Sequence, residues 1–587
     1  MKRFSIAFVL VTAGAAYAAG CGTGDVGDTS LSKPAEPGAD PNSTMPKTTA
    51  PTDCIPPACQ VFPLPTSAHA VRLTNPQWER TIQDLLKLDN QPGNSVNFPP
   101  DPIASPDKFG QDAGDLVVGT EYWAAYQMAA ESLASLVTGD PSQLDRILPD
   151  AAKAGDTAAR VSAFVTDFLP RAYRRAVTAK EIADVIATGE AAALNVSMGD
   201  PFVVRAYWIL SAILQSPKFI YKISLGDGAV KDSRARLSGY EIAAKLSYGL
   251  WGTMPDDGLV AQVKAGKLAT NAGVAAVAAA MLADPRAKVG LLDFHDQLYL
   301  VNHYDDVKNR PMDLFPSFYT GYMADARQDL RLTVQNLIID NNGGFKELTT
   351  SPVVFVNNTL APAYGIDPST VPELSGAGQD VFAKVTLDPK QRSGMLMHVG
   401  WLAYEGSPSE PSPIHRGAFI ARHVICSPLG SPPPGAAGAD PSKAKQPTNR
   451  LRVAQTTAGC GDGCHGGKGG VINPLGFSFE GFDSIGAIRT SDGMDTNNMP
   501  IPVDTTGEVD LVGKFSSAVD LFKTVSTNAR SHACYAAHWS SYLNGMSTVD
   551  VTPKYLSPAI GKSLKNGSVR DVIIELVQTD AFLTVSR

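Results

Sequence analysis

Amphipathic helical patterning dominates the chain from about residue 70 onward. Apolar residues recur at three- and four-residue spacing, most clearly at Met323, Ala326, Leu330 and Val334. Further stripes begin at helix-capping signatures at Thr74, Thr178 and Ser238, and the tail repeats the pattern from Ser568. Alternating, strand-like patterns are sparse. The sequence therefore predicts a mainly α fold whose apolar stripes are core faces.

The composition limits the class of protein. A length of 587 residues suits about four domains. With 44% hydrophobic residues the chain can bury cores throughout, which excludes general disorder. The net charge of -8 argues against a nucleic-acid-binding protein, which would carry a basic footprint. The 52 glycines and 43 prolines indicate long connecting segments between the folded parts.

The N-terminus reads as an export signal. The basic start Met1-Lys2-Arg3 precedes an apolar run, which ends in small residues before Cys21. We expect residues 1–21 to be a lipoprotein signal peptide and Cys21 to be lipidated. The alternative is ordinary cleavage after Ala18, which leaves Cys21 a free thiol. Both interpretations of this N-terminus predict export to an oxidising compartment, where disulfides form.

Residues 22–68 are rich in Gly, Pro, Ser and Thr and lack hydrophobic periodicity, so we expect a flexible tether. Cys54 and Cys59 lie near its end around a Pro-Pro turn, where a local disulfide is the favoured interpretation.

The segment Cys460-Gly-Asp-Gly-Cys464-His465 forms a C-x-x-x-C-H motif. In the related C-x-x-C-H motif, two thiols attach a haem covalently and the histidine is the proximal iron ligand. The glycine-rich surroundings let the longer loop reach both vinyl groups. The motif predicts one covalent haem c at Cys460, Cys464 and His465. A disulfide-closed loop and a zinc site are the alternatives.

A sixth iron ligand would decide the chemistry of such a haem. Met499, followed by a proline in a predicted loop, is the candidate, and Met494, His532 and His538 compete with it. Met/His ligation favours electron transfer, whereas an open site permits peroxide or oxygen chemistry.

Cys426 and Cys534 each lie in an apolar helical context. In an oxidising compartment we expect them to form a disulfide, with buried free thiols as the alternative.

Several segments together resemble the large secreted cytochrome-c-associated proteins of environmental bacteria, which are built from a tandem of helical domains of unknown function. The matching stretches are Arg72 to Leu86, Phe168 to Arg175, Ser216 to Tyr221, Leu237 to Asp257, Phe355 to Ile366, Arg392 to Gly417, Cys426 with Pro432 to Pro434, and Asn473 to Asp483. The usual motif of that family is C-x-x-C-H, and this chain departs from it by one inserted residue. The resemblance implies an architecture but no established activity. Members of that family are discussed as accessory proteins in redox processes or polymer degradation, which gives only a hint of function.

We therefore expect a multi-domain helical body with a C-terminal cytochrome-c-like haem-attachment loop. The expected domains after the tether are 69–150, 151–225, 226–370, 385–490 (carrying the loop) and 500–587.

The expected function is extracytoplasmic electron transfer by an exported, lipid-anchored c-type-cytochrome-like protein, at the outer membrane, on the cell surface or in the periplasm. Its partners would be redox proteins or an extracellular oxidative enzyme, in an oxidative or polymer-degrading system. A haem-free surface lipoprotein that binds a partner or polymer, and a haem peroxidase or oxidase, are the alternatives. We find no nucleophile–base motif such as G-x-S-x-G, so the sequence does not support a hydrolase.

Overall fold

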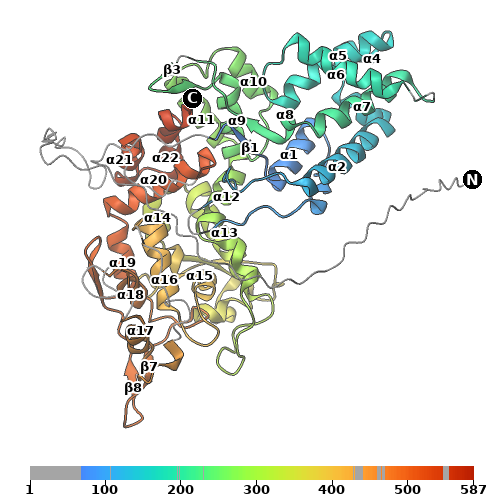
Figure 1. Ribbon diagram of the computed structural model, residues 1–587. Coiled ribbons are helices and arrows are strands. Elements are labelled where there is room, and N and C mark those ends of the chain that lie inside the picture. Colours follow the sequence, from blue (N-terminus) through green and yellow to red (C-terminus); the bar gives the residue numbers. More distant parts are fainter. Residues whose placement is uncertain are drawn as a thin grey trace, which may run out of the picture. The chain divides into compact units, whose positions relative to one another are not determined.

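The structure is a computed structural model. It describes residues 68–105, 108–194, 196, 198–228, 230–427, 429, 441–458, 464–465, 470–546 and 554–587. The described residues form a mainly helical body with short strands (Figure 1). The mainly α fold is therefore confirmed.

The first group of helices surrounds a core of its own. These helices are α1 (Asn75–Leu85), α2 (Thr120–Gly139), α3 (Pro141–Ile147), α4 (Asp150–Lys153), α5 (Thr157–Tyr173), α6 (Ala179–Ala193), α7 (Pro201–Leu214) and α8 (Pro217–Ile220). Their buried side chains, including Trp78, Tyr126 and Phe164, make one continuous apolar cluster. Residues from the expected domains 69–150 and 151–225 thus share a single core.

The remaining helices belong to the rest of the body. They are α9 (Gly239–Leu250), α10 (Asp257–Lys264), α11 (Asn271–Ala283), α12 (Ala287–Leu298), α13 (Tyr322–Val334), α14 (Phe345–Thr350), α15 (Val399–Tyr404), α16 (Pro413–Phe419), α17 (Asn449–Thr457), α18 (Ile472–Phe477), α19 (Ala518–Val525), α20 (Ala529–Asn544), α21 (Ser557–Leu564), α22 (Val569–Leu576) and α23 (Asp580–Leu583). Two π-helical segments, η3 (Gln335–Asp340) and η8 (Ile420–Val424), extend α13 and α16. Short 3₁₀ turns are η1 (Asn94–Asn97), η2 (Val301–Asp306), η4 (Ala361–Tyr364), η5 (Pro368–Thr370), η6 (Pro372–Leu374), η7 (Met395–Met397), η9 (Pro441–Lys443) and η10 (Lys554–Leu556).

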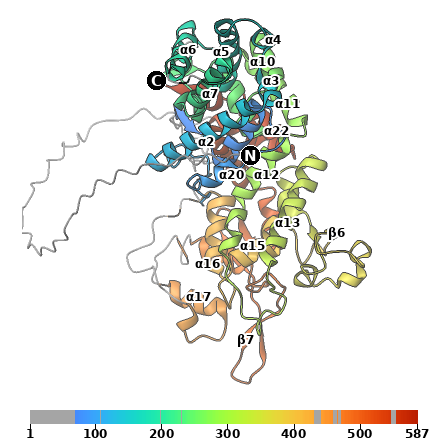
Figure 2. The ribbon, with the colours of Figure 1, turned by 90° about the vertical axis from the view of Figure 1, so that its right-hand side faces the viewer.

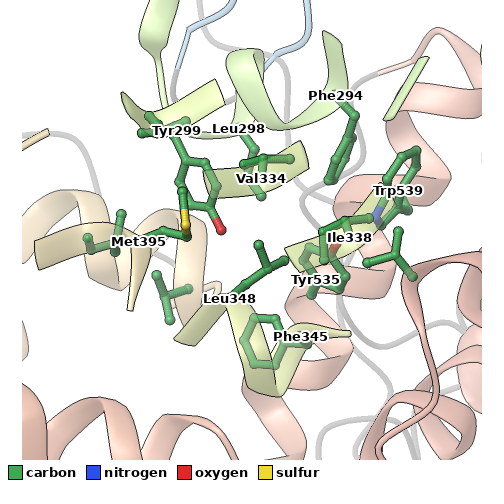
Figure 3. Close-up of a cluster of buried hydrophobic side chains, with 14 of the residues drawn as sticks. Phe294, Leu298, Tyr299, Val334, Ile338, Phe345, Leu348, Met395, Tyr535 and Trp539 are labelled. Carbon is green, nitrogen blue, oxygen red and sulfur yellow. The ribbon is translucent and has the colours of Figure 1, made fainter. Parts of the chain in front are cut away.

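The second core lies where central and C-terminal helices meet (Figure 3). Phe294 of α12 stacks on Trp539 of α20 with ring centroids 3.6 Å apart. Phe345 of α14 contacts Tyr535 of α20 at 5.0 Å. In both ribbon views the red C-terminal helices lie beside the green central ones, so the end of the chain completes the core of its middle (Figures 1 and 2).

The strands form small antiparallel sheets, of which some are local hairpins and others connect distant segments. The pairs are β1 (Ala70–Arg72) with β2 (Tyr221–Ile223), β5 (Val353–Val356) with β6 (Ala383–Thr386), β7 (Ser491–Met494) with β8 (Pro500–Pro502), and β9 (Gly507–Val509) with β10 (Gly513–Phe515). A three-stranded sheet has the order β11 (Thr584–Ser586), β4 (Arg234–Arg236), β3 (Val230–Lys231). Through β11 the C-terminus is thus fixed beside residues 234–236.

Local capping accounts for the helix starts that the sequence predicts. Thr74, Thr178, Ser238 and Ser568 each accept a hydrogen bond from the backbone three residues ahead and complete a capping box. Each capping box satisfies backbone N–H groups that the first helical turn leaves without partners. These predicted starts are confirmed. Among the described residues, no helix is long and apolar enough to cross a membrane.

Candidate functional site

The candidate haem-attachment residues divide between described and undescribed parts of the chain. Cys464 and His465 are described, and both are half-buried. Cys460 lies outside the described residues, as do Cys21, Cys54 and Cys59. The geometry of the site therefore rests on Cys464, His465 and their neighbours.

Backbone hydrogen bonds hold Cys464 and His465 against the start of α18. The carbonyl oxygen of Cys464 accepts from the N–H groups of Val471 (3.0 Å) and Ile472 (2.9 Å). The carbonyl oxygen of His465 accepts from the N–H group of Asn473 at 3.1 Å. Cys464 also packs against the second core. The Cys-His pair is thus attached to a rigid element by its own backbone.

The imidazole of His465 is oriented by the side chain of Asn473. Its Nδ1 lies 3.1 Å from Oδ1 of Asn473. Nδ2 of that amide donates to Oγ1 of Thr457 at 2.8 Å, and Oγ1 in turn donates to the carbonyl of Val453. This chain of donors assigns Oδ1 as an acceptor, so Nδ1 of His465 carries the proton. Nε2 is then the nitrogen with a lone pair available for a metal.

This geometry fits the haem that the motif implies. A metal-ligating histidine normally donates its other ring N–H to an oxygen, which fixes the tautomer and the ring orientation. His465 has that partner in Asn473, and the neighbouring Cys464 is a free thiol. Cys460 and Cys464 would hold the group covalently, and His465 would bind its iron.

The helix that supports the site is locked by a close crossing with α16. A Cβ atom on Gly417 would lie 1.9 Å from the carbonyl oxygen of Ile472, and one on Gly476 would lie 1.8 Å from that of Pro413. Only glycine permits this approach, because any other residue would overlap the opposing backbone. The two glycines therefore bring the backbones of α16 and α18 into contact.

Arg416 anchors the same crossing from within the core. Its guanidinium is fully buried and donates to the carbonyl oxygens of Leu402 (2.8 Å), Phe482 (3.1 Å) and Asp483 (2.7 Å), with Phe479 at 3.3 Å. Burial lowers the pKa of Arg416 to about 10, partly offset by neighbouring carboxylates. The side chain thus ties α16 to the segment that follows α18.

Met499, the candidate sixth ligand, lies in the turn between β7 and β8. The side chain is 61% exposed. The backbone N–H of Met499 donates to Oδ1 of Asp495. The carbonyl oxygen of Met499 accepts from the backbone N–H of Asp495. No contact between Met499 and His465 is found among the described residues. The competing candidate His532 is buried and bonded to Ser563 and Ser526.

A second group of cysteines and histidines lies where η8 meets α20. Cys426 and Cys534 are joined by a disulfide, the pairing that the sequence favours, with sulfurs 2.07 Å apart. Nε2 of His538 lies 3.5 Å from Sγ of Cys534 and also contacts the carbonyl of His423. The sulfurs of Cys426 and Cys534 and the ring nitrogen of His538 lie close enough together to suit a metal ion. Because the sulfurs are bonded to each other, neither is a thiolate ligand in this state.

Sequence reasoning missed the residues that orient His465. Asn473 belongs to a stretch that carries the family resemblance, but no role followed from its position, and Thr457 gave no signal. An amide eight residues after a candidate ligand histidine could have been considered as its hydrogen-bond partner.

Four family models match successive segments of the chain. Each describes a protein of unknown function: DUF1587 (PSD3) at residues 72–139, DUF1595 (PSD5) at 160–223, DUF1592 (PSD4) at 237–366 and DUF1588 (PSCyt3) at 392–492. The PSCyt3 match includes the C-x-x-x-C-H motif. No curated protein matches the chain, and neither does any solved structure. The chain therefore carries four domains of unknown function in tandem, consistent with the predicted resemblance to cytochrome-c-associated proteins.

Proposed function

We propose that this protein is an exported c-type-cytochrome-like electron carrier. The observation that carries the proposal is the orientation of His465 by Asn473 within the C-x-x-x-C-H motif. Cys460 and Cys464 would attach one haem through thioether bonds, and Nε2 of His465 would bind the iron. When bound, this group supplies one-electron chemistry at its iron.

The chain's own residues would then position the redox centre. Asn473 keeps the proton on Nδ1 of His465. Because α18 is fixed by its crossing with α16, the orientation of the His465 imidazole is fixed as well. A histidine held in one orientation would bind the iron with little rearrangement of the protein. Met499 remains the predicted distal ligand. The partner would be a redox protein or an extracellular oxidative enzyme in an oxidative or polymer-degrading system.

The test is expression of the full chain in a host that matures c-type cytochromes. We expect a haem-stained band on a denaturing gel and a c-type pyridine haemochrome spectrum, with covalent haem lost in Cys460→Ser and Cys464→Ser. His465→Ala should lose the low-spin spectrum. A matched control is Cys426→Ala/Cys534→Ala, which removes two cysteines outside the motif and should retain haem. An intact mass showing a Cys460–Cys464 disulfide and no haem would overturn the proposal in favour of the haem-free lipoprotein.

We further propose that Cys21 is lipidated and anchors the protein to the outer membrane or cell surface. Support comes from the basic start, the apolar run and the small residues before Cys21. Metabolic labelling with a fatty acid should mark the protein, and Cys21→Ser should abolish the label and release the protein as a soluble periplasmic form. Unchanged membrane association in Cys21→Ser would contradict the anchor.

A further inference from the structure

Two lysines line a cavity between β2, α9 and the C-terminal elements. Lys222 lies on β2 and Lys245 on α9. The walls also come from the end of α20 and from β11, so segments far apart in sequence enclose the space. Its volume of about 70 Å³ compares with the roughly 10–15 Å³ that a single water needs. The cavity therefore has room for a small molecule.

The ammonium groups of both lysines are only partly satisfied. Nζ of Lys222 donates to Oε1 of Gln77 at 3.1 Å. Nζ of Lys245 donates to Oδ1 of Asn544 (2.8 Å) and the carbonyl of Phe582 (2.7 Å). An ammonium has three donors, so each lysine retains hydrogen-bonding capacity beyond these contacts. The hydrogen-bond partners are neutral oxygens. Each ammonium also lies over an aromatic ring, Lys222 over Tyr248 at 5.3 Å and Lys245 over Phe582 at 4.3 Å.

The cavity has cationic groups without a matching acid. The described lining residues include no aspartate or glutamate, and neither lysine forms an ion pair with another described residue. Glu241, whose charge acts on Lys245, has its carboxylate occupied by the backbone N–H groups of Leu225, Gly226 and Ser238. The positive charge in this cavity therefore has no counterion from these residues.

The electrostatic surroundings point the same way. Burial lowers the pKa of Lys222 to about 7, helped by the positive charges of Arg174 and Arg72. Burial also lowers the pKa of Lys245 to about 7, with Arg234 and Lys222 lowering it further and Glu241 opposing. A bound anion would relieve this repulsion and favour the charged lysines.

A neighbouring cavity provides an internal contrast. It holds about 240 Å³ and shares Gln77, Gln111, Tyr248 and Tyr542 with the lysine-lined cavity. It is lined by two acids, Asp101 and Asp293, and by the base Arg80. Asp101 pairs with Arg72 at 2.7 Å, and Asp293 is acted on by the charge of Arg80 and accepts from the Tyr542 hydroxyl at 2.7 Å. Acidic and basic groups are thus both present in this cavity, whereas the described lining of the lysine-lined cavity has bases without acids.

The walls of the lysine-lined cavity indicate what kind of anion it takes. Val71, Leu237, Leu543, Ala581 and Val585 supply apolar surface, while Ser224 and Ser540 add hydroxyls. We propose that this cavity binds a small organic carboxylate, whose charged end contacts Lys222 and Lys245 and whose hydrocarbon part lies on the apolar walls. This site is separate from the candidate haem site, and its test does not depend on haem.

The test is isothermal titration calorimetry of the full chain with acetate, succinate and inorganic phosphate, in a buffer free of these anions. We expect one saturable carboxylate site per chain. Lys222→Met and Lys245→Met should each weaken binding by about tenfold or more, because each removes a charge-assisted hydrogen bond. Raising the pH from about 6.5 to about 8.5 should weaken it by about tenfold or more as the lysines lose their protons. Lys180→Met, which removes an exposed lysine, should leave the affinity within about twofold of the parent.

Lys222→Gln and Lys245→Gln provide a second pair of variants if a methionine variant does not fold, with folding checked by circular dichroism. Absence of carboxylate binding at millimolar concentration would overturn the proposal. So would binding that survives in the Lys222/Lys245 double variant. Binding of phosphate without either carboxylate would overturn the choice of ligand class.

Discussion

Cysteine and histidine occur together at two places in this molecule, and the two places differ in what surrounds them. At the Cys464–His465 loop the side chains are half-buried, and a hydrogen bond orients the ring of His465. At the Cys426–Cys534 disulfide both cysteines are buried, and His538 stacks with His423 at 5.7 Å. The first place leaves a ring nitrogen available for a ligand, whereas the second closes its cysteines in a cross-link. Residue type alone does not separate a candidate cofactor site from a structural one; packing does.

The largest expected effect comes from removing the cross-link. Cys426→Ala/Cys534→Ala should lower the free energy of unfolding by about 2–5 kcal/mol, because the disulfide closes a long loop in the unfolded chain. The bond spans 108 residues of sequence. Urea denaturation of the haem-free protein measures this loss. Cys464→Ser is the control, since Cys464 is a free thiol, and it should change stability far less. Equal losses in both variants would erase the contrast between the two places.

The buried histidines at the disulfide site should contribute to the pH dependence of stability. Burial lowers the pKa of His538 to about 4, and it lowers that of His423 well below its usual value, with His538 and Arg422 adding to the effect. Between pH 6.5 and about 4 these histidines take up protons in the unfolded chain but not in the folded one, so their contribution to stability falls as pH falls through this window. Buried Glu405 and Glu480, whose pKa burial raises to about 7, contribute with the opposite sign. The loss from His538 alone approaches about 3 kcal/mol at the acid end.

Denaturation curves measured across this pH window test the prediction, with His538→Gln expected to reduce the loss of stability on acidification relative to the parent. Buried His295, whose pKa burial also lowers to about 4, contributes a residual slope in the variant. A slope unchanged by His538→Gln would contradict the assignment of proton exclusion to the disulfide site.

At the Cys464–His465 loop, the sharpest test is Asn473. Asn473→Leu leaves both Nδ1 of His465 and Oγ1 of Thr457 without this partner, at a cost of about 1–3 kcal/mol. In the haem-loaded protein it should also reduce the low-spin fraction, because the ring loses its orientation. The optical spectrum and the melting curve report the two effects separately.

Asn473→Asp is the matched variant, because it retains an acceptor for Nδ1. It should preserve the low-spin spectrum and lower the reduction potential, since a carboxylate makes the histidine a stronger donor to iron. A low-spin fraction that Asn473→Leu leaves intact would show that Asn473 does not orient His465.

The smallest expected change in stability is at Met499. Because this side chain lies in an exposed turn, Met499→Leu should alter the free energy of unfolding by no more than about 0.5 kcal/mol. If Met499 is the distal ligand, the same variant changes the visible spectrum and lowers the reduction potential of the haem-loaded protein. An unchanged spectrum would remove Met499 as a ligand, and Met494→Leu would be measured beside it.

What the sequence by itself determined is local. Thr74, Thr178 and Ser238 mark helix starts correctly because a capping box is complete within four consecutive residues. The spacing of Cys460, Cys464 and His465 likewise defines a candidate haem site from adjacent residues. The succession of family-like segments along the chain could also be recognised, because each carries its own contiguous motif.

Only the tertiary structure decided which distant residues meet. Asn473 bonds Thr457 across the motif, and Lys222 and Lys245 share a cavity with residues near the C-terminus. In the sequence these side chains are ordinary polar positions, since no periodicity records how strongly each is desolvated or which neighbour it faces. Burial and hydrogen bonding between distant segments depend on how the helices pack. The packing therefore orients His465 as a candidate ligand and brings Lys222 and Lys245 together as a candidate anion site.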